Sequence, residues 1–433
     1  MQLIQFFRIQ LKAQIHSVIE LISNAAWLLS AELIAKISRI FTIVILAAQL
    51  SPTSYGTAML ALAFHDVFGL LLRAGVGSQI INCKPEQLTS FAKNGVIIQW
   101  AVCLTIAIGQ FTSAGYLSSL YDNENIIILL QIMAVIYLLY PWVSIKIFLL
   151  QRENKMRWFS IRNGLCVIIE NCTIAISALL GADILSVALG KIAFSIFWLL
   201  LFYFSPVKSY GVEFNISIIK QMLKTSGKLF NTEFLRGIRL HADTFIAGKL
   251  LTPELFGFYT FAKNAGVGLS QSISQVYIGA LYPYLCKLER KGQLLLQEKK
   301  VFVISLGVGF LFVIQALIAP IYVPILFDEK WSSAIPIITV LCLAALPSLI
   351  IDIICCMQRV REKYHTETIG RLVCLFISLI ALYIFSPNEP MQFALVIFFS
   401  SLFCLIPIYL INVTAPFSHL FSSEFNRRKS HES

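Results

Sequence analysis

The residues of this chain that could do chemistry are charged side chains placed inside otherwise apolar stretches. Nine Lys or Arg and six Asp or Glu lie in such stretches. A charge near the centre of a bilayer costs roughly 2.5–3.5 kcal/mol, so these side chains must face water, a ligand or one another. The cations are Lys36, Arg39, Arg73, Lys146, Lys191, Arg236, Arg239, Lys249 and Lys263, and the acids are Glu32, Asp66, Glu170, Glu233, Asp243 and Asp352.

Most of these charges fall in only four apolar stretches, 22–49, 55–82, 226–250 and 255–283, which hold eleven of the fifteen. If each stretch is a helix that turns by about 100° per residue, the charges of each stretch, apart from Lys249, share one face. Seven of the eleven are cations and four are acids. The four helices therefore predict a hydrated, cationic cavity between the two halves of the chain.

A cationic cavity inside a membrane calls for an anionic ligand, and the planar guanidinium of Arg suits a phosphate because it donates two parallel hydrogen bonds. An excess of cations over acids cannot be cancelled by local ion pairs alone, although pairs such as Glu32–Lys36 and Asp66–Arg73 are an alternative use of these residues. Glu170 and Asp352 are expected to form local structural pairs. The predicted substrate-binding residues are Lys36, Arg39, Arg73, Arg236, Arg239 and Lys263, and the residues predicted to hold a coupling ion or to form ion pairs are Glu32, Asp66, Glu233 and Asp243.

The elements that position these charges are helices long enough to cross a bilayer. The chain has 433 residues, of which 58% are hydrophobic and 13% are charged, and about 20 apolar residues span a membrane. The composition predicts an all-α integral membrane protein with twelve spans. They are 22–49, 55–82, 95–120, 126–150, 158–181, 184–205, 226–250, 255–283, 300–325, 334–358, 367–386 and 391–415.

The connections between these spans alternate in charge. With the N-terminus on the cytoplasmic side, the cytoplasmic connections and tails carry 24 Lys or Arg and the opposite connections carry only Lys330. The positive-inside rule then predicts that both termini are cytoplasmic. The net charge of +11 is spread over these connections, so no nucleic-acid surface is expected. The ten Cys are scattered without paired spacing, so neither a disulfide framework nor a metal site is predicted.

A short motif occurs twice, 201 residues apart. The stretch Leu50-Ser51-Pro52-Thr53-Ser54-Tyr55-Gly56 is echoed by Leu251-Thr252-Pro253-Glu254-Leu255-Phe256-Gly257. A Ser or Thr followed by Pro marks the start of a helix, since the hydroxyl caps it and Pro suits its first turn. Six spans lie between the copies, so the halves are expected to be parallel six-helix bundles related by a pseudo-two-fold axis along the membrane normal.

This organisation predicts five segments. An amphipathic cytoplasmic segment (1–21) precedes an N-terminal six-helix bundle (22–205), a cytoplasmic linker (206–225), a C-terminal six-helix bundle (226–415) and a cytoplasmic tail (416–433). No connection is long enough for a catalytic domain, so an enzyme is not expected. Proline residues in or beside the spans predict kinks; they are Pro141, Pro320, Pro324, Pro336, Pro347 and Pro407.

The twelve spans, the repeated Ser/Thr-Pro-x-x-Tyr/Phe-Gly turn and the charges of spans 1, 2, 7 and 8 resemble the Wzx-type polysaccharide flippases. The stretch from Asp243 to Ala262, followed by Leu281-Tyr282-Pro283, is similar to the seventh and eighth helices of that family. The family belongs to the multidrug/oligosaccharidyl-lipid/polysaccharide exporter superfamily. The resemblance implies transport of an undecaprenyl-pyrophosphate-linked oligosaccharide from the cytoplasmic to the periplasmic leaflet of the inner membrane, for O-antigen or capsule assembly.

The same resemblance implies that the cationic residues meet the pyrophosphate or acidic sugars, and that a cation gradient drives transport. No cofactor is expected beyond H⁺ or Na⁺ as the coupling ion, and the expected partners are the lipid-linked glycan, the bilayer and the polysaccharide polymerase of the same pathway. A monomer is expected.

Two alternative functions stay open. One is a multidrug/cation antiporter of the same superfamily, for which an acidic cavity would be typical, and the other is a membrane polysaccharide polymerase or glycosyltransferase.

Overall fold

The computed structural model describes residues 34–414 except 74–75, 154, 269, 272, 276, 279–280, 283–284, 286–293 and 362. At residues 73, 78, 82, 225–236, 239–240, 294–300, 364 and 411–414 the backbone alone is described. The chain divides into two compact units, Met1–His241 and Ala242–Ser433. The predicted amphipathic segment 1–21 and the tail 416–433 lie outside the described residues.

The first unit is all helical in its described part. A helix over residues 34–49 is followed by α2 (Pro52–Leu70), the short η1 (Leu71–Arg73) and α3 (Val76–Asn82), then by the long α4 (Pro85–Tyr121). Next come α5 (Asn125–Val135), η2 (Ile136–Leu138), α6 (Pro141–Arg152), α7 (Met156–Leu179) and α8 (Leu185–Tyr203). The next helix, α9 (Ile216–Leu250), crosses the division between the units, and its first residues, 216–225, belong to the predicted linker.

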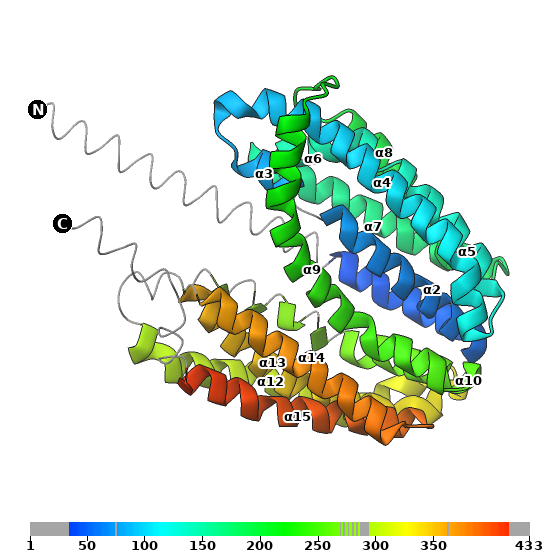
Figure 1. The fold of residues 1–433 in the computed structure, drawn as a ribbon. Helices are drawn as coiled ribbons and strands as arrows, with labels where there is room; N and C mark the ends of the chain where they lie inside the picture. Colours follow the sequence, from blue (N-terminus) through cyan, green and yellow to red (C-terminus); the bar gives the residue numbers. More distant parts are fainter. Residues whose placement is uncertain are drawn as a thin grey trace, which may run out of the picture. The chain divides into compact units, whose positions relative to one another are not determined.

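The second unit is also helical where it is described. After α9 it continues with α10 (Pro253–Ala262) and a π-helical turn (Lys263–Val267), then α12 (Leu294–Leu326) and the 3₁₀ segment η4 (Glu329–Ala334). The last three helices are α13 (Ile335–Val360), α14 (Tyr364–Phe385) and α15 (Pro390–Thr414). Within this unit α13 packs against α12, α14 and α15 (Figure 1).

The repeated turn motif starts a helix in both units, as predicted. The Ser51 hydroxyl accepts a hydrogen bond from the Ser54 amide at 3.1 Å, and the Thr252 hydroxyl accepts one from the Leu255 amide at 3.4 Å. The next residue in each copy is Pro, at the first position of α2 or α10. Because the preceding helices end at residues 49 and 250, each copy joins two helices through a turn of two residues. The predicted symmetry axis stays a prediction.

The fourth predicted span is broken in the middle. Residues Asn125–Leu138 and Pro141–Arg152 form two helices that meet at an angle of 60°. Pro141 opens the second helix, which fits the predicted kink because proline cannot donate the hydrogen bond that would continue the first helix. By contrast, four other prolines lie inside continuous helices: Pro320 and Pro324 in α12, Pro347 in α13 and Pro407 in α15.

Several helices show the length and composition of membrane spans. Among the described residues seven helices qualify, and an eighth is added if the bent pair is one span. On α12, Leu317, Ile321 and Ile325 lie four residues apart and are 71%, 60% and 74% exposed. Such an outward apolar stripe is stable facing lipid and unfavourable in water. The described helices that do not qualify include α2, α9 and α10, which belong to the charged predicted spans. The count of twelve spans stays a prediction.

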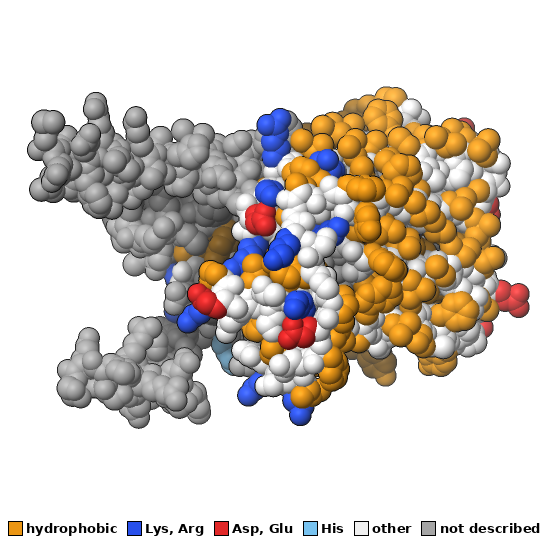
Figure 2. Space-filling view, turned by 90° about the horizontal axis from the view of Figure 1, so that it is seen from above, with side chains coloured by type: hydrophobic (Ala, Val, Ile, Leu, Met, Phe, Trp, Pro, Cys, Tyr) orange, Lys and Arg blue, Asp and Glu red, His pale blue; other side chains and the backbone are white. Residues whose placement is uncertain are grey.

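Figure 2 shows one face of the molecule, on which a broad hydrophobic surface is bordered at one end by Lys and Arg side chains. Among the basic residues of the predicted cytoplasmic connections, Lys93 forms an ion pair with Glu213 at 3.1 Å. The Lys155 ammonium donates to the Pro206 carbonyl at 2.7 Å. Arg152 donates to the carbonyls of Ile80 and Ile81 at 2.8 and 3.0 Å and so satisfies the end of α3. These contacts tie the connections of the first unit together.

Candidate functional site

The first unit contains an ion pair on neighbouring helices. The Glu170 carboxylate of α7 lies 2.8 Å from the Lys191 ammonium of α8, and the two side chains are 12% and 23% exposed. Lys191 also lies within electrostatic reach of Asp66 on α2 and Arg39 on the helix over 34–49. Four charged side chains from four helices therefore interact in one region of this unit.

Close helix packing positions this cluster. A Cβ atom at Gly190 would lie 2.2 Å from the Ile174 Cγ1 and 3.1 Å from the Glu170 carbonyl oxygen. Only glycine permits this approach of α7 and α8. Asn171, next to Glu170, donates to the Ser38 hydroxyl at 2.7 Å, and Thr42 donates to the Asn171 carbonyl at 3.2 Å. These two hydrogen bonds hold the helix over 34–49, which carries Lys36 and Arg39, against α7.

A buried hydrogen-bond network adjoins the cluster. The His65 Nδ1 lies 3.2 Å from the Gln110 Oε1 and 3.1 Å from the Tyr137 hydroxyl oxygen. The Tyr137 hydroxyl is 2.7 Å from the His65 carbonyl, to which it donates, and the Gln110 Nε2 donates to the Leu130 carbonyl at 2.8 Å. His65, Gln110 and Tyr137 are 8%, 0% and 3% exposed. The network joins α2, α4 and η2 within the unit.

The second unit contains a separate polar cluster. The Lys263 ammonium lies 2.7 Å from the Asp243 Oδ2 and donates to the Thr244 hydroxyl at 2.8 Å. The Tyr259 hydroxyl, which is fully buried, donates to the same carboxylate at 2.7 Å. Both ion-pair partners are 20% exposed, so the cluster is mostly enclosed. In this cluster a predicted substrate cation is neutralised by a predicted coupling acid.

Lys263 also begins an irregular turn. Residues Lys263–Val267 form a π-helix after α10, in which each carbonyl bonds an amide five residues on and the backbone is locally widened. Polar side chains of α12 stabilise it: the Gln315 Nε2 donates to the Gly266 carbonyl at 2.9 Å, and Ser270 donates to the Gln315 Oε1 at 2.8 Å. Turns of this kind occur frequently at functional sites.

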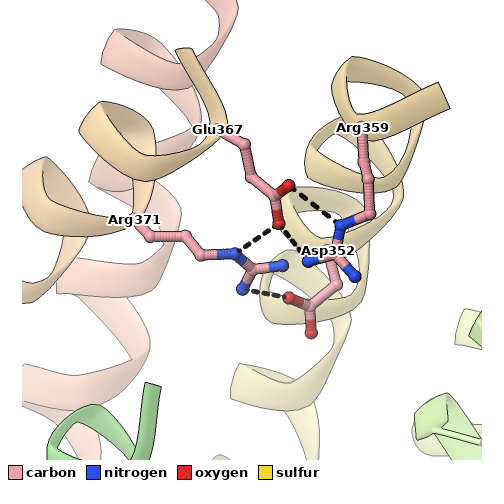
Figure 3. A network of polar contacts seen from close by, with 4 residues as sticks. All are labelled: Asp352, Arg359, Glu367 and Arg371. Carbon is pink, nitrogen blue, oxygen red and sulfur yellow. Dashed lines mark hydrogen bonds and ion pairs between the residues drawn. The ribbon is translucent and has the colours of Figure 1, made fainter. Parts of the chain in front are cut away.

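A third charged cluster joins α13 and α14 (Figure 3). The Arg371 guanidinium donates to the carboxylates of Asp352 and Glu367, at 3.0 Å in each case. The Arg359 guanidinium donates to both oxygens of Glu367 at 3.0 and 2.5 Å. The expectation that Asp352 and Glu170 form local ion pairs is confirmed. This cluster has as many acids as cations, so it offers no surplus charge to a ligand.

The remaining predicted site residues are described only in part. Lys36 is half-buried, and Arg39 and Asp66 are exposed. Glu32 lies outside the described residues, while the backbone alone is described at Arg73, Glu233, Arg236 and Arg239. Their assignment to substrate or coupling ion stays a prediction. The structure pairs Asp243 with Lys263 and places Arg39 and Asp66 each within electrostatic reach of Lys191.

Comparison with known proteins identifies the family of this chain. Residues 45–336 match the family described as "Polysaccharide biosynthesis protein". The chain belongs to this family. It is 21% identical over 335 residues to the lipopolysaccharide biosynthesis protein WzxC of Escherichia coli (strain K12), covering 75% of this chain and 67% of that protein. It is 24% identical over 316 residues to the succinoglycan biosynthesis transport protein ExoT of Rhizobium meliloti (strain 1021), covering 70% of this chain and 62% of that protein.

A solved structure supports the same fold. The lipid II flippase MurJ in an inward closed conformation superposes with a TM-score of 0.71 at 16% identity, covering 88% of this chain and 86% of that one. The family match and the curated relatives confirm the expected resemblance to Wzx-type polysaccharide flippases. With the apolar helices they support the expectation of a multi-pass membrane protein that is not an enzyme.

The sequence reasoning overlooked part of the polar interior of the first unit. It did not consider His65, Gln110 or Tyr137. A signal was present, since a histidine directly precedes Asp66 in a predicted span and a glutamine lies within another. Polar side chains are costly in hydrocarbon unless they are hydrogen-bonded, so a histidine and a glutamine within predicted spans indicate a buried hydrogen-bond network.

Proposed function

We propose that this protein flips undecaprenyl-pyrophosphate-linked oligosaccharide repeat units from the cytoplasmic to the periplasmic leaflet of the inner membrane by alternating access. The observation that carries the proposal is the match of residues 45–336 to the polysaccharide biosynthesis family in a chain whose described helices hold ionised side chains within apolar segments. Buried charge of this kind is expensive to insert and marks a transport path.

The cations are proposed to meet the pyrophosphate. Arg39 is the best candidate among the described residues, because it is exposed and its guanidinium can donate two parallel hydrogen bonds to phosphate. Lys36 lies one turn earlier on the same helix and would add an ammonium. Arg73, Arg236 and Arg239 are proposed to serve in the same way. The polyprenyl tail would stay in the lipid while the sugar head passes through the protein.

The pairing of Lys263 with Asp243 suggests how a cation gradient couples to this path. While the carboxylate is ionised, it holds the Lys263 ammonium at 2.7 Å. A proton or Na⁺ bound by Asp243 would weaken that pair and release the ammonium toward an anionic substrate. The Asp243 carboxylate and the anionic substrate would thus compete for one lysine, so that cation binding and substrate binding are linked through this pair.

The proposal is tested by deleting the gene in its own host. Loss of surface polysaccharide, with the lipid-linked repeat unit accumulating on the cytoplasmic side, is expected. Complementation with the triple variant Arg39→Ala, Arg236→Ala and Arg239→Ala should fail, whereas Lys330→Ala, a cation of a predicted external connection, should complement fully. Unchanged surface polysaccharide in the triple variant, at normal protein levels, would show that these arginines are not the substrate ligands.

A second candidate is a multidrug/cation antiporter of the same superfamily. It is favoured by the Asp243–Lys263 ion pair, which occupies one of the cations predicted to bind the substrate. Growth of the deletion strain on cationic drugs separates the two functions. A flippase predicts no change in sensitivity, and an antiporter predicts a marked increase.

A further inference from the structure

The His65 network has a hydrogen-bond geometry that defines the state of the imidazole. The Tyr137 hydroxyl has one proton, and the shorter of its two contacts, 2.7 Å, is to the His65 carbonyl. Its oxygen therefore faces the His65 Nδ1 as an acceptor. The Gln110 amide is oriented by donation from its Nε2 to the Leu130 carbonyl, so the atom that faces Nδ1 is the acceptor Oε1.

Two acceptors around Nδ1 require a proton on that nitrogen. In a neutral imidazole one nitrogen carries the proton and the other is a free base. The free base of His65 is then Nε2, which forms no hydrogen bond within the described part of the chain. A buried base held in one tautomer by two fixed acceptors can take up a proton without losing its existing contacts.

The charged groups that act on His65 lie on two helices, and one of them has an acidic partner on a third. Asp66 on α2 and Lys191 on α8 act on it electrostatically, and Lys191 is itself paired with Glu170 on α7 at 2.8 Å. Asp66 would attract an imidazolium and Lys191 would repel it, while Tyr137 and the fully buried Cys103 are the other titratable groups packed nearby. A shift of Lys191 toward or away from Glu170 would therefore change the proton affinity of His65.

We propose that His65 is a proton-binding site of the first unit, taking a proton from water on Nε2 and returning it there as transport proceeds. The step converts neutral imidazole to imidazolium and breaks no other bond. It deepens the proposed function, on which it rests, because it names a coupling group and makes the proton the coupling ion in this unit. The carboxylates predicted from sequence would then act as counter-ions around the histidine.

The variant His65→Asn tests the site in the full-length protein. Its amide nitrogen can replace the Nδ1 donor toward Gln110 and Tyr137, but it has no base in place of Nε2. Surface polysaccharide is measured in the complemented deletion strain across the whole pH range that the host tolerates. The wild-type output should vary with pH, and the variant should show low output without that variation. The control His365→Asn changes an exposed histidine of α14 and should behave as wild type.

The outcomes separate the two claims. Failure of the wild-type gene to restore polysaccharide would overturn the proposed function itself. Restoration by wild type together with an unchanged pH response in His65→Asn would overturn only the role of His65.

A second measurement does not depend on the folding of a variant. In wild-type protein with ¹⁵N-labelled histidine, reconstituted in lipid nanodiscs, the resonance absent from His65→Asn should show a neutral, Nδ1-protonated ring at high pH and an imidazolium at low pH. If that ring carried its proton on Nε2, or failed to titrate before the protein unfolded, the proposal would be wrong.

Discussion

The contacts of single side chains show how this protein keeps charge within its apolar interior. Lys263 is held by the carboxylate of Asp243 and the hydroxyl of Thr244, and Tyr259 donates to the same carboxylate. Ion pairs of this kind are weak sources of net stability, but removal of one partner leaves an unpaired charge that is costly. The cluster should therefore tolerate loss of both charges better than loss of either one.

A double-mutant cycle measures this coupling. Lys263→Met and Asp243→Leu should each lower the free energy of unfolding by about 2–3 kcal/mol, and the double variant should recover most of that loss. Thermal unfolding of the purified protein in detergent gives the stabilities. The double variant should nevertheless fail to export polysaccharide if the pair couples transport. Additive destabilisation in the double variant would contradict the account of the pair.

The same residues show what could be predicted at this scale. The types and positions of the charges were available from the sequence, because a charge within an apolar stretch stands out. Their partners were not, since Lys263 meets Asp243 only when α10 packs beside α9, and helical spacing carries no information on contacts between helices. The role of Lys263 as a substrate ligand stays a prediction, and the structure adds its acidic partner within the same unit.

At the scale of helices, close packing and buried ion pairs determine which elements stay together. The cluster of Figure 3 joins α13 to α14 through Glu367, whose side chain is 8% exposed and accepts hydrogen bonds from two arginines. Glu367→Gln removes the charge that both arginines share. It should destabilise the protein by about 2 kcal/mol and increase hydrogen exchange in the α13–α14 turn. The control Glu389→Gln, at an exposed position before α15, should change neither the stability nor the hydrogen exchange. Equal effects of Glu367→Gln and Glu389→Gln would refute a special role for the cluster.

A substitution at Gly190 of α8 tests the close contact between α7 and α8. In Gly190→Ala the added methyl group would collide with Ile174, so the helices must separate and the Glu170–Lys191 pair must lengthen. A loss of about 1–3 kcal/mol is expected in thermal unfolding. Gly115→Ala is the matched control on α4, because among the described residues no atom beyond its own stretch of helix backbone and its chain neighbours lies within 4 Å of its Cβ position. It should be neutral or stabilise by up to about 1 kcal/mol through helix propensity. A stable Gly190→Ala protein would show that α7 and α8 are not in close contact.

Helices and their starts were predictable because their causes are local. The cap of Ser51 or Thr252 and the proline after it act within four residues, so the paired turns follow from the sequence alone. Breaks within the spans were harder to predict from the sequence. Pro141 does mark the 60° bend, but Pro347 and Pro407 lie within continuous helices, since neighbouring helices can satisfy the freed backbone groups of a membrane helix.

At the scale of the whole molecule, the charge of the connections predicts the orientation in the membrane. A single cysteine in place of Asp122, in the turn after α4, should react with a membrane-impermeant maleimide applied to intact spheroplasts. A cysteine in place of Lys208, in the connection before α9, should react only after permeabilisation. These results follow from the positive-inside rule, and the reverse labelling pattern would invert the proposed direction of transport.

Family membership and buried charge lead to one expectation, that this chain by itself moves a lipid-linked glycan between leaflets. The most direct measurement reconstitutes the purified full-length protein in liposomes that hold the host's undecaprenyl-pyrophosphate-linked repeat unit and follows the arrival of the sugar at the outer surface with a sugar-specific lectin. A proton gradient should accelerate exposure of the inner-leaflet fraction. With the triple variant Arg39→Ala, Arg236→Ala and Arg239→Ala, the lectin should detect only the repeat units that already lay in the outer leaflet. Equal exposure in liposomes with and without the protein, under a gradient of either sign, would contradict the proposed function.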